Sequence, residues 1–138
     1  MVKTEIWNSE YSIGVEKIDD QHKMLFMKLD DLLNAMRMRN NNVEIIRSLD
    51  NFERFVNRCF DDEEQIQRDI KYYGYRLQRQ KHDEFRYKLQ ELRVQLENKI
   101  VDSRLIIKTE NELTTWWIEH ITNLDNELGK HLVTISTI

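Results

Sequence analysis

The sequence has no proline, three glycines and a single cysteine among 138 residues. The lack of proline and the scarcity of glycine exclude collagen-like and proline-rich chains and argue against a turn-dense all-β fold. One cysteine cannot form an internal disulfide, so nothing calls for an oxidising compartment. The first residues lack the apolar stretch of a signal peptide, and no apolar run is long enough to span a bilayer. We therefore expect a cytoplasmic protein that does not enter the membrane.

Charged residues make up 33% of the chain and hydrophobic residues 40%, which is typical of a folded domain rather than a disordered one. At this length the chain can bury a substantial core, and it is too short for two ordinary domains. A net charge of −4 gives no general attraction to nucleic acid or to an anionic membrane. We expect one domain over residues 1–138, and neither nucleic acid nor membrane as a partner.

Apolar residues recur at intervals of three or four along most of the chain, which predicts helices. The expected helices cover residues 19–39, 43–72, 77–98 and 109–129. An irregular arm over 1–17, with Trp7 and Tyr11, precedes a helical bundle over 18–130, and Gly74 is expected to cap the second helix at its C-terminal end. Because the connections are short, the prediction is an all-α fold, an antiparallel up-down-up-down four-helix bundle.

Four polar residues interrupt the apolar stripes, one on each expected helix: His22, Glu63, His82 and His120. Burying a carboxylate or a charged imidazole costs several kcal/mol unless the group is paired or binds a metal. A lone histidine in a core is usually just hydrogen-bonded. Four such residues on four facing helices instead indicate a metal site inside the bundle. Imidazole and carboxylate ligands suit iron, manganese or zinc.

Several short motifs follow one another in the order of the helices. They are Trp7, Gly14-Val15, Ile18-Asp19-Asp20-Gln21-His22-Lys23, Leu25-Phe26, Phe60-Asp61-Asp62-Glu63-Glu64, His82-Asp83-Glu84-Phe85, Trp116-Trp117-Ile118-Glu119-His120-Ile121 and Asp125. In this combination the sequence resembles the hemerythrins, and in particular the bacterial hemerythrin-like domains (bacteriohemerythrins). The resemblance extends over nearly the whole chain.

The resemblance implies a non-haem centre of two irons held by five histidines and two bridging carboxylates. Position by position, the matching ligands in this chain are His22, Glu63, His82, His120 and Asp125. Five of seven are present, because Cys59 and Gln78 stand where the family has histidines. The resemblance places His22 and the Cys59 position on one metal. It places His82, His120 and the Gln78 position on the other, with Glu63 and Asp125 as the bridges.

The altered positions leave alternatives open. Cys59 is a weak or altered ligand, or a small buried hydrophobic residue. Gln78 is a weak neutral oxygen ligand, or a solvated or hydrogen-bonded side chain. Trp117 stands where the family has a leucine that lines the dioxygen pocket, so its ring either fills the ligand pocket or belongs to the core packing. Glu64 is expected on a solvated face.

The spacing of His120 and Asp125 makes a specific structural demand. Five residues on a regular α-helix separate two side chains by about 140°. Both can face one site only if the helix is locally widened, as in a π-bulge, or ends early.

Two classes of function remain. The first is a hemerythrin-like protein that binds dioxygen or a related small ligand at a di-iron centre, for storage, delivery or sensing, without being an enzyme. The alternative is a derived four-helix module that has lost dioxygen chemistry. Such a module binds a single metal, for example zinc, or none, and has a structural or signalling role. No protein partner can be named from the sequence.

Overall fold

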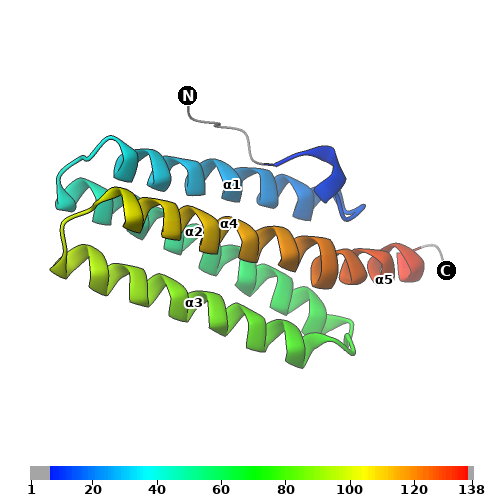
Figure 1. Ribbon diagram of the computed structural model, residues 1–138. Coiled ribbons are helices and arrows are strands. Elements are labelled where there is room, and N and C mark those ends of the chain that lie inside the picture. Colours follow the sequence, from blue (N-terminus) through cyan, green and yellow to red (C-terminus); the bar gives the residue numbers. More distant parts are fainter. Residues whose placement is uncertain (1–6, 137–138) are drawn as a thin grey trace.

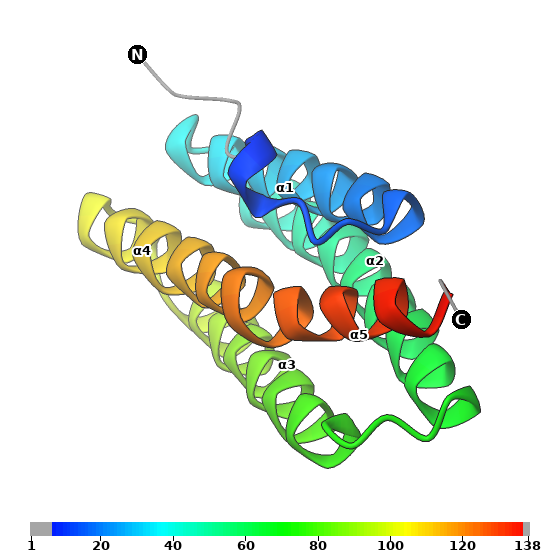
Figure 2. The same cartoon turned by 90° about the vertical axis from the view of Figure 1, so that its right-hand side faces the viewer.

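The computed structural model describes residues 7–136 and confirms the all-α four-helix bundle (Figures 1 and 2). Residues 1–6 of the expected arm lie outside the described residues. A short 3-10 turn, Ser9–Tyr11, precedes the first long helix. The helices are α1 Glu16–Arg37, α2 Asn42–Asp69, α3 Tyr75–Asn98 and α4 Ser103–His120, followed by a π-helical turn, Ile121–Asp125, and α5 Asn126–Ser136. Helix α1 packs against α2 and α4, and α2 packs against α3.

The apolar periodicity identifies the buried face of each helix. On α3 every residue of the expected stripe is buried, namely Gln78, His82, Phe85, Leu89, Leu92 and Leu96. Full burial of one such leucine or phenylalanine contributes about 1.5–3 kcal/mol, so this face alone fixes the orientation of α3. The polar members of the stripe are thereby held inside the bundle.

The fourth expected helix, 109–129, was too short at both ends. Helix α4 begins at Ser103, where the side chain of Asp102 accepts a hydrogen bond from the backbone N–H of Leu105 at 2.8 Å. Asp102 is therefore the N-cap of α4, a position that aspartate favours. At the other end, the π-helical turn leads directly into α5, which continues to Ser136.

Gly74 was expected to end the second helix, and this was wrong. Helix α2 ends at Asp69, and Lys71 takes the left-handed conformation with φ of 54°. Gly74 instead stands immediately before α3 with φ of −89°. A Cβ atom on Gly74 would lie 2.7 Å from a ring carbon of Tyr72, so the close approach of that ring is what requires glycine.

The segment before α1 is held by contacts with the first turn of α1 and with α5. The carboxylate of Asp19 accepts hydrogen bonds from the hydroxyl of Ser12 and from the backbone N–H of Ile13. Ile13 in turn lies against α5 at Gly129, where an added Cβ would be 2.1 Å from the Ile13 carbonyl oxygen. The arm and α5 therefore touch backbone to backbone.

Gly129→Ala should consequently destabilise the protein, although alanine favours helix more than glycine does. The new methyl group must displace the backbone at Ile13, and overpacking of this kind typically costs ~1–3 kcal/mol. We expect a loss of at least this size in the free energy of unfolding measured with urea. Lys130→Ala, on the exposed side of α5, is the control and should change it by less than about 0.5 kcal/mol. Equal free energies of unfolding for Gly129→Ala and Lys130→Ala would contradict the close contact between Gly129 and Ile13.

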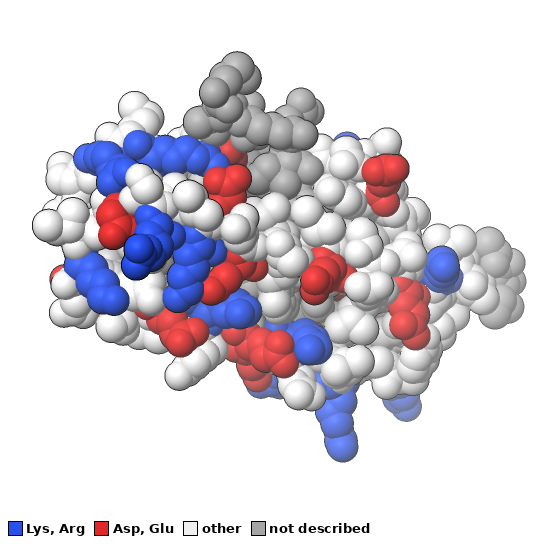
Figure 3. Space-filling view, in the orientation of Figure 1, with Lys and Arg blue, Asp and Glu red and all other residues white. Residues whose placement is uncertain are grey.

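The surface carries charges of both signs, interspersed over the face shown in Figure 3. Within residues 7–136, no helix is both long enough and apolar enough to cross a lipid bilayer.

Candidate metal centre

Five side chains, contributed by helices α1 to α4 and by the π-helical turn that follows α4, meet in one layer of the core. His22 comes from α1, Glu63 from α2, His82 from α3, His120 from the last residue of α4 and Asp125 from the π-helical turn. Each is at most 5% exposed. The structure thus brings together all five residues that the resemblance to hemerythrins implied as ligands.

The π-helical turn explains how α4 supplies two of these residues. It covers Ile121–Asp125, the interval between His120 and Asp125. The wider turn brings the two side chains to the same side, with Nε2 of His120 3.3 Å from Oδ1 of Asp125. The local widening expected from the five-residue spacing is therefore confirmed.

The ligand atoms form two groups that share Glu63. One group contains Glu63, His82 and His120, and the other contains His22, Glu63 and Asp125, and within each group the atoms lie within 4.8 Å of one another. The side chains thus form two adjacent candidate metal positions, which share Glu63, rather than a single one.

Both carboxylates lie between the two positions. Oε2 of Glu63 is 3.2 Å from Nε2 of His22, and its Oε1 is 3.9 Å from Nε2 of His82. Oδ2 of Asp125 is 3.3 Å from His22, and its Oδ1 faces His120. Each carboxylate therefore lies between a histidine of one group and a histidine of the other.

Without metal, the layer is an ion cluster. Burial alone would lower the pKa of His22, but its contacts with Asp125 and Glu63 outweigh burial and raise the pKa to about 10. Burial and the charge of Asp125 raise the pKa of Glu63. Burial opposes ionisation of Asp125 too, yet His120 and His22 hold its pKa well below the usual value. In the metal-free protein, the proton on His22 therefore supplies the positive charge that a bound metal cation would supply to the two carboxylates.

The stability of the metal-free protein should fall at high pH as a result. His22 has a folded pKa of about 10 against an ordinary 6.5, so its contribution is complete below pH 6.5 and is lost as pH rises toward 10. Urea unfolding across this interval should show the loss, and His22→Gln should show a smaller one. A parent protein with the same pH profile as His22→Gln would contradict the assignment.

The donor atoms themselves fit a metal. Within the described residues, five buried atoms of the cluster residues lack a hydrogen bond of good geometry: Nδ1 of His22, Oε1 of Glu63, Nε2 of His82, Nε2 of His120 and Oδ2 of Asp125. Buried polar atoms are rarely left in this condition, because each costs about 1–3 kcal/mol. Imidazole nitrogens and carboxylate oxygens at these positions suit iron, manganese or zinc.

Cys59 is buried on α2 but belongs to neither group of ligand atoms. Burial, together with the negative charges of Glu63 and Asp62, raises the pKa of its thiol far above the usual range. The geometry therefore favours Cys59 as a small buried hydrophobic residue.

Gln78 is almost fully buried, so the solvated alternative is wrong. Its Nε2 donates a hydrogen bond of 3.0 Å to Oδ1 of Asp125. The amide thus orients the carboxylate of Asp125.

Trp117 is fully buried beside the layer. Its ring stacks on Phe60 with centroids 5.4 Å apart and lies 6.2 Å from the ring of His22. It also lies 6.0 Å from the ring of His120, so it packs in the core beside both groups of ligand atoms.

Glu64 was expected to be solvated, and the structure contradicts this. It is 4% exposed, and its Oε2 lies 2.6 Å from Nδ1 of His82. Burial opposes ionisation of Glu64, but the contact with His82 and the charges of Arg86 and Arg79 lower its pKa. A sequence signal did exist, since Glu64 follows the buried Phe60 by four residues, one helical turn.

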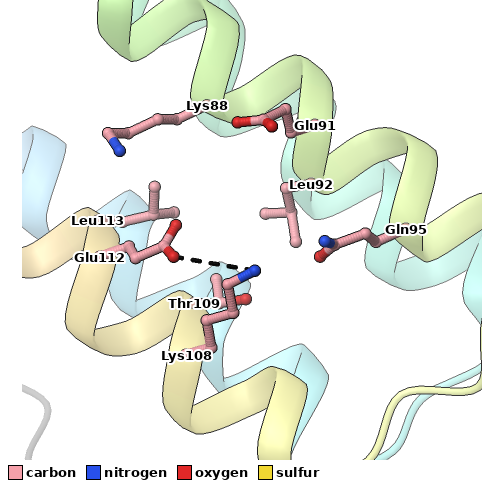
Figure 4. Close-up of a pocket in the computed structure, with 8 residues that line it drawn as sticks. All are labelled: Lys88, Glu91, Leu92, Gln95, Lys108, Thr109, Glu112 and Leu113. Atoms are coloured by element: carbon pink, nitrogen blue, oxygen red, sulfur yellow. Dashed lines mark ion pairs between the residues drawn. The ribbon is translucent and has the colours of Figure 1, made fainter.

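A surface pocket is separate from this layer. It lies between α3 and α4, has a volume of about 180 Å³ and is lined by residues that include Lys88, Glu91, Lys108 and Glu112 (Figure 4). None of its lining residues belongs to the buried cluster.

Comparison with known proteins agrees with the geometry. Residues 13–132 match the family model described as the hemerythrin HHE cation-binding domain. The chain is 24% identical to myohemerythrin from Sipunculus nudus over 120 residues, which covers 87% of each protein. A solved structure of a leucine-to-phenylalanine mutant shares the fold, with a TM-score of 0.78 and 23% identity over 90% of this chain and 93% of that one. The chain belongs to the hemerythrin family of cation-binding domains.

Proposed function

We propose that the protein binds iron in the buried layer, at two positions bridged by Glu63 and Asp125, and that it binds rather than transforms a small ligand such as dioxygen. The observation that carries this proposal is the convergence of five buried donor residues whose nitrogen and oxygen atoms face one another in two groups. Family membership supports a cation in this layer. The expected setting is the cytoplasm, in keeping with the single free cysteine.

The residues have distinct tasks in this proposal. His22 would hold the metal at one position and His82 with His120 the metal at the other, while the two carboxylates would hold both. Gln78 orients Asp125, and the rings of Phe60 and Trp117 exclude water from the layer. Iron held in this way supplies the redox chemistry with which dioxygen or a similar small molecule can be bound.

A second candidate follows from the altered positions. Cys59 is not among the grouped ligand atoms, so the group around His22 contains a single histidine. This weakens the His22 position and favours a protein that holds a single metal, such as zinc, in a structural or signalling role.

Anaerobic loading tests the proposal. Metal-free protein should be incubated with ferrous iron without air, desalted and analysed for iron, and its absorption spectrum recorded before and after exposure to air. We expect bound iron and a spectrum characteristic of an oxo-bridged pair after oxidation. A single zinc, retained in preference to iron, would establish the second candidate instead. Less than about a tenth of an equivalent of either metal would exclude both.

A further inference from the structure

The contact between Glu64 and His82 lies behind the candidate metal centre rather than in it. Glu64 belongs to neither group of ligand atoms, yet both side chains are buried. The carboxylate oxygen and Nδ1 of the ring are 2.6 Å apart, which is the length of a strong, charge-assisted hydrogen bond.

This contact determines which ring nitrogen of His82 carries the proton. An ionised carboxylate only accepts hydrogen bonds, so Nδ1 must be the donor. In a neutral imidazole the other nitrogen, Nε2, then has a free lone pair. Nε2 of His82 faces Oε1 of Glu63 at 3.9 Å and has no hydrogen-bond partner within residues 7–136. The lone pair thus points into the cluster.

The surroundings hold both partners in place. The ring of His82 is stacked on Phe60, with centroids 3.8 Å apart and planes within 8° of each other. Arg86 lies 5.0 Å from the centroid of Phe60 and 3.8 Å from Oε2 of Glu64, and Arg79 lies 3.9 Å from Oε1 of Glu64. Neither the imidazole nor the carboxylate can turn away without losing these contacts.

His22 has no comparable support. Its Nδ1 is buried and lacks a hydrogen-bond partner among the residues that the structure describes. The histidine that would share this metal in the hemerythrins is replaced by Cys59, which belongs to neither group of ligand atoms. The two positions of the centre are therefore unequally prepared, one with a fixed imidazole and the other without.

We propose that Glu64 is a positioning residue, and that by fixing His82 it makes the position formed by Glu63, His82 and His120 the first to bind metal. This inference rests on the proposed function, because it assumes that the layer binds metal. Carboxylates that orient a ligating histidine typically contribute 10–100-fold to metal affinity.

Three variants separate positioning from a general structural role. Glu64→Leu removes the acceptor, Glu64→Gln retains a weaker acceptor in its amide oxygen, and Asp61→Leu removes another carboxylate of α2 near Arg86 without touching His82. In the metal-free protein, nitrogen-15 NMR of the imidazoles should find the proton on Nδ1 of His82 in the parent and in Asp61→Leu. Glu64→Leu should lose this preference.

Zinc titration of the same proteins gives the functional readout. We expect the affinity for the first metal to fall by about 10–100-fold in Glu64→Leu, by less in Glu64→Gln and by under about threefold in the control. In a His82→Ala background, Glu64→Leu should have no further effect on the remaining position, because Glu64 acts through His82. If Glu64→Leu does not fold, the graded response and the NMR of Glu64→Gln decide the question.

The outcomes distinguish this inference from the proposed function. If the parent protein binds neither zinc nor iron, the proposed function is wrong, and so is the proposal that one of the two positions binds metal first. A parent that binds metal while Glu64→Leu binds the first equivalent equally tightly contradicts the positioning role alone. An unchanged His82 tautomer in Glu64→Leu also contradicts it.

Discussion

Glu63→Gln is expected to abolish metal binding at both positions while the bundle remains folded. Glu63 belongs to both groups of ligand atoms, with one oxygen facing His22 and the other facing His82. A neutral amide binds cations far more weakly than a carboxylate does. Because even residues behind the ligands contribute about 10–100-fold, we expect the affinity to fall by more than about 100-fold.

The folded state should tolerate this change. Glutamine has nearly the shape of a protonated glutamate, and burial already raises the pKa of Glu63. His22 would keep its contact with Asp125. We expect the metal-free variant to lose ~1–3 kcal/mol in the free energy of unfolding, as for a hydrogen bond to a charged group. Glu53→Gln, which alters a surface ion pair of α2 with Arg93, is the matched control and should bind metal as the parent does. Undiminished binding by Glu63→Gln would place the metal elsewhere.

The double variant Cys59→His, Gln78→His should bind two metals more tightly than the parent. Each residue precedes an existing donor by four positions, Cys59 before Glu63 and Gln78 before His82, so the new imidazole would lie on the same helix face. Both positions are buried. Overpacking is expected to cost ~1–3 kcal/mol in the metal-free protein. Metal at about 100 times its dissociation constant should return ~2.7 kcal/mol.

Thermal or urea unfolding with and without ferrous iron measures this effect. The double variant should be less stable than the parent without iron and gain more from iron than the parent gains. Cys59→Ala, Gln78→Ala is the control, because it alters the same two positions without adding donors. Dioxygen binding is a separate question, since Trp117 still packs beside His22, and the triple variant with Trp117→Leu addresses it. A double variant that takes up no more iron than the parent would show that the two lost histidines are not the limiting defect.

The sequence was sufficient for the arrangement of the helices and for most of the inward side chains on them. On α3 the apolar period places His82 and Gln78 correctly, because burial follows the helical repeat. Asp125 is different. The regular helical repeat would place its side chain on a different face from His120. Only the resemblance to hemerythrins, which required a locally widened helix, predicted that Asp125 faces the cluster.

Other features depend on contacts that a one-dimensional pattern does not contain. Glu64 is buried because His82 and two arginines from α3 satisfy its carboxylate, and charged residues are otherwise expected at the surface. Gly74 is needed because the ring of Tyr72 folds back on it, a packing effect rather than a helix-ending one. Gln67, four residues after Glu63, is also fully buried, which the amide side chain did not suggest.

The most direct test of the buried centre is X-ray absorption of the zinc-loaded protein at the metal edge. The geometry predicts nitrogen and oxygen neighbours at about 2.0–2.2 Å, with the outer scattering of imidazole rings, from His82 and His120 together with Glu63. It predicts no sulfur neighbour near ~2.3 Å, since Cys59 belongs to neither group of ligand atoms. A sulfur neighbour, or a metal surrounded by oxygen alone without imidazole, would contradict the account.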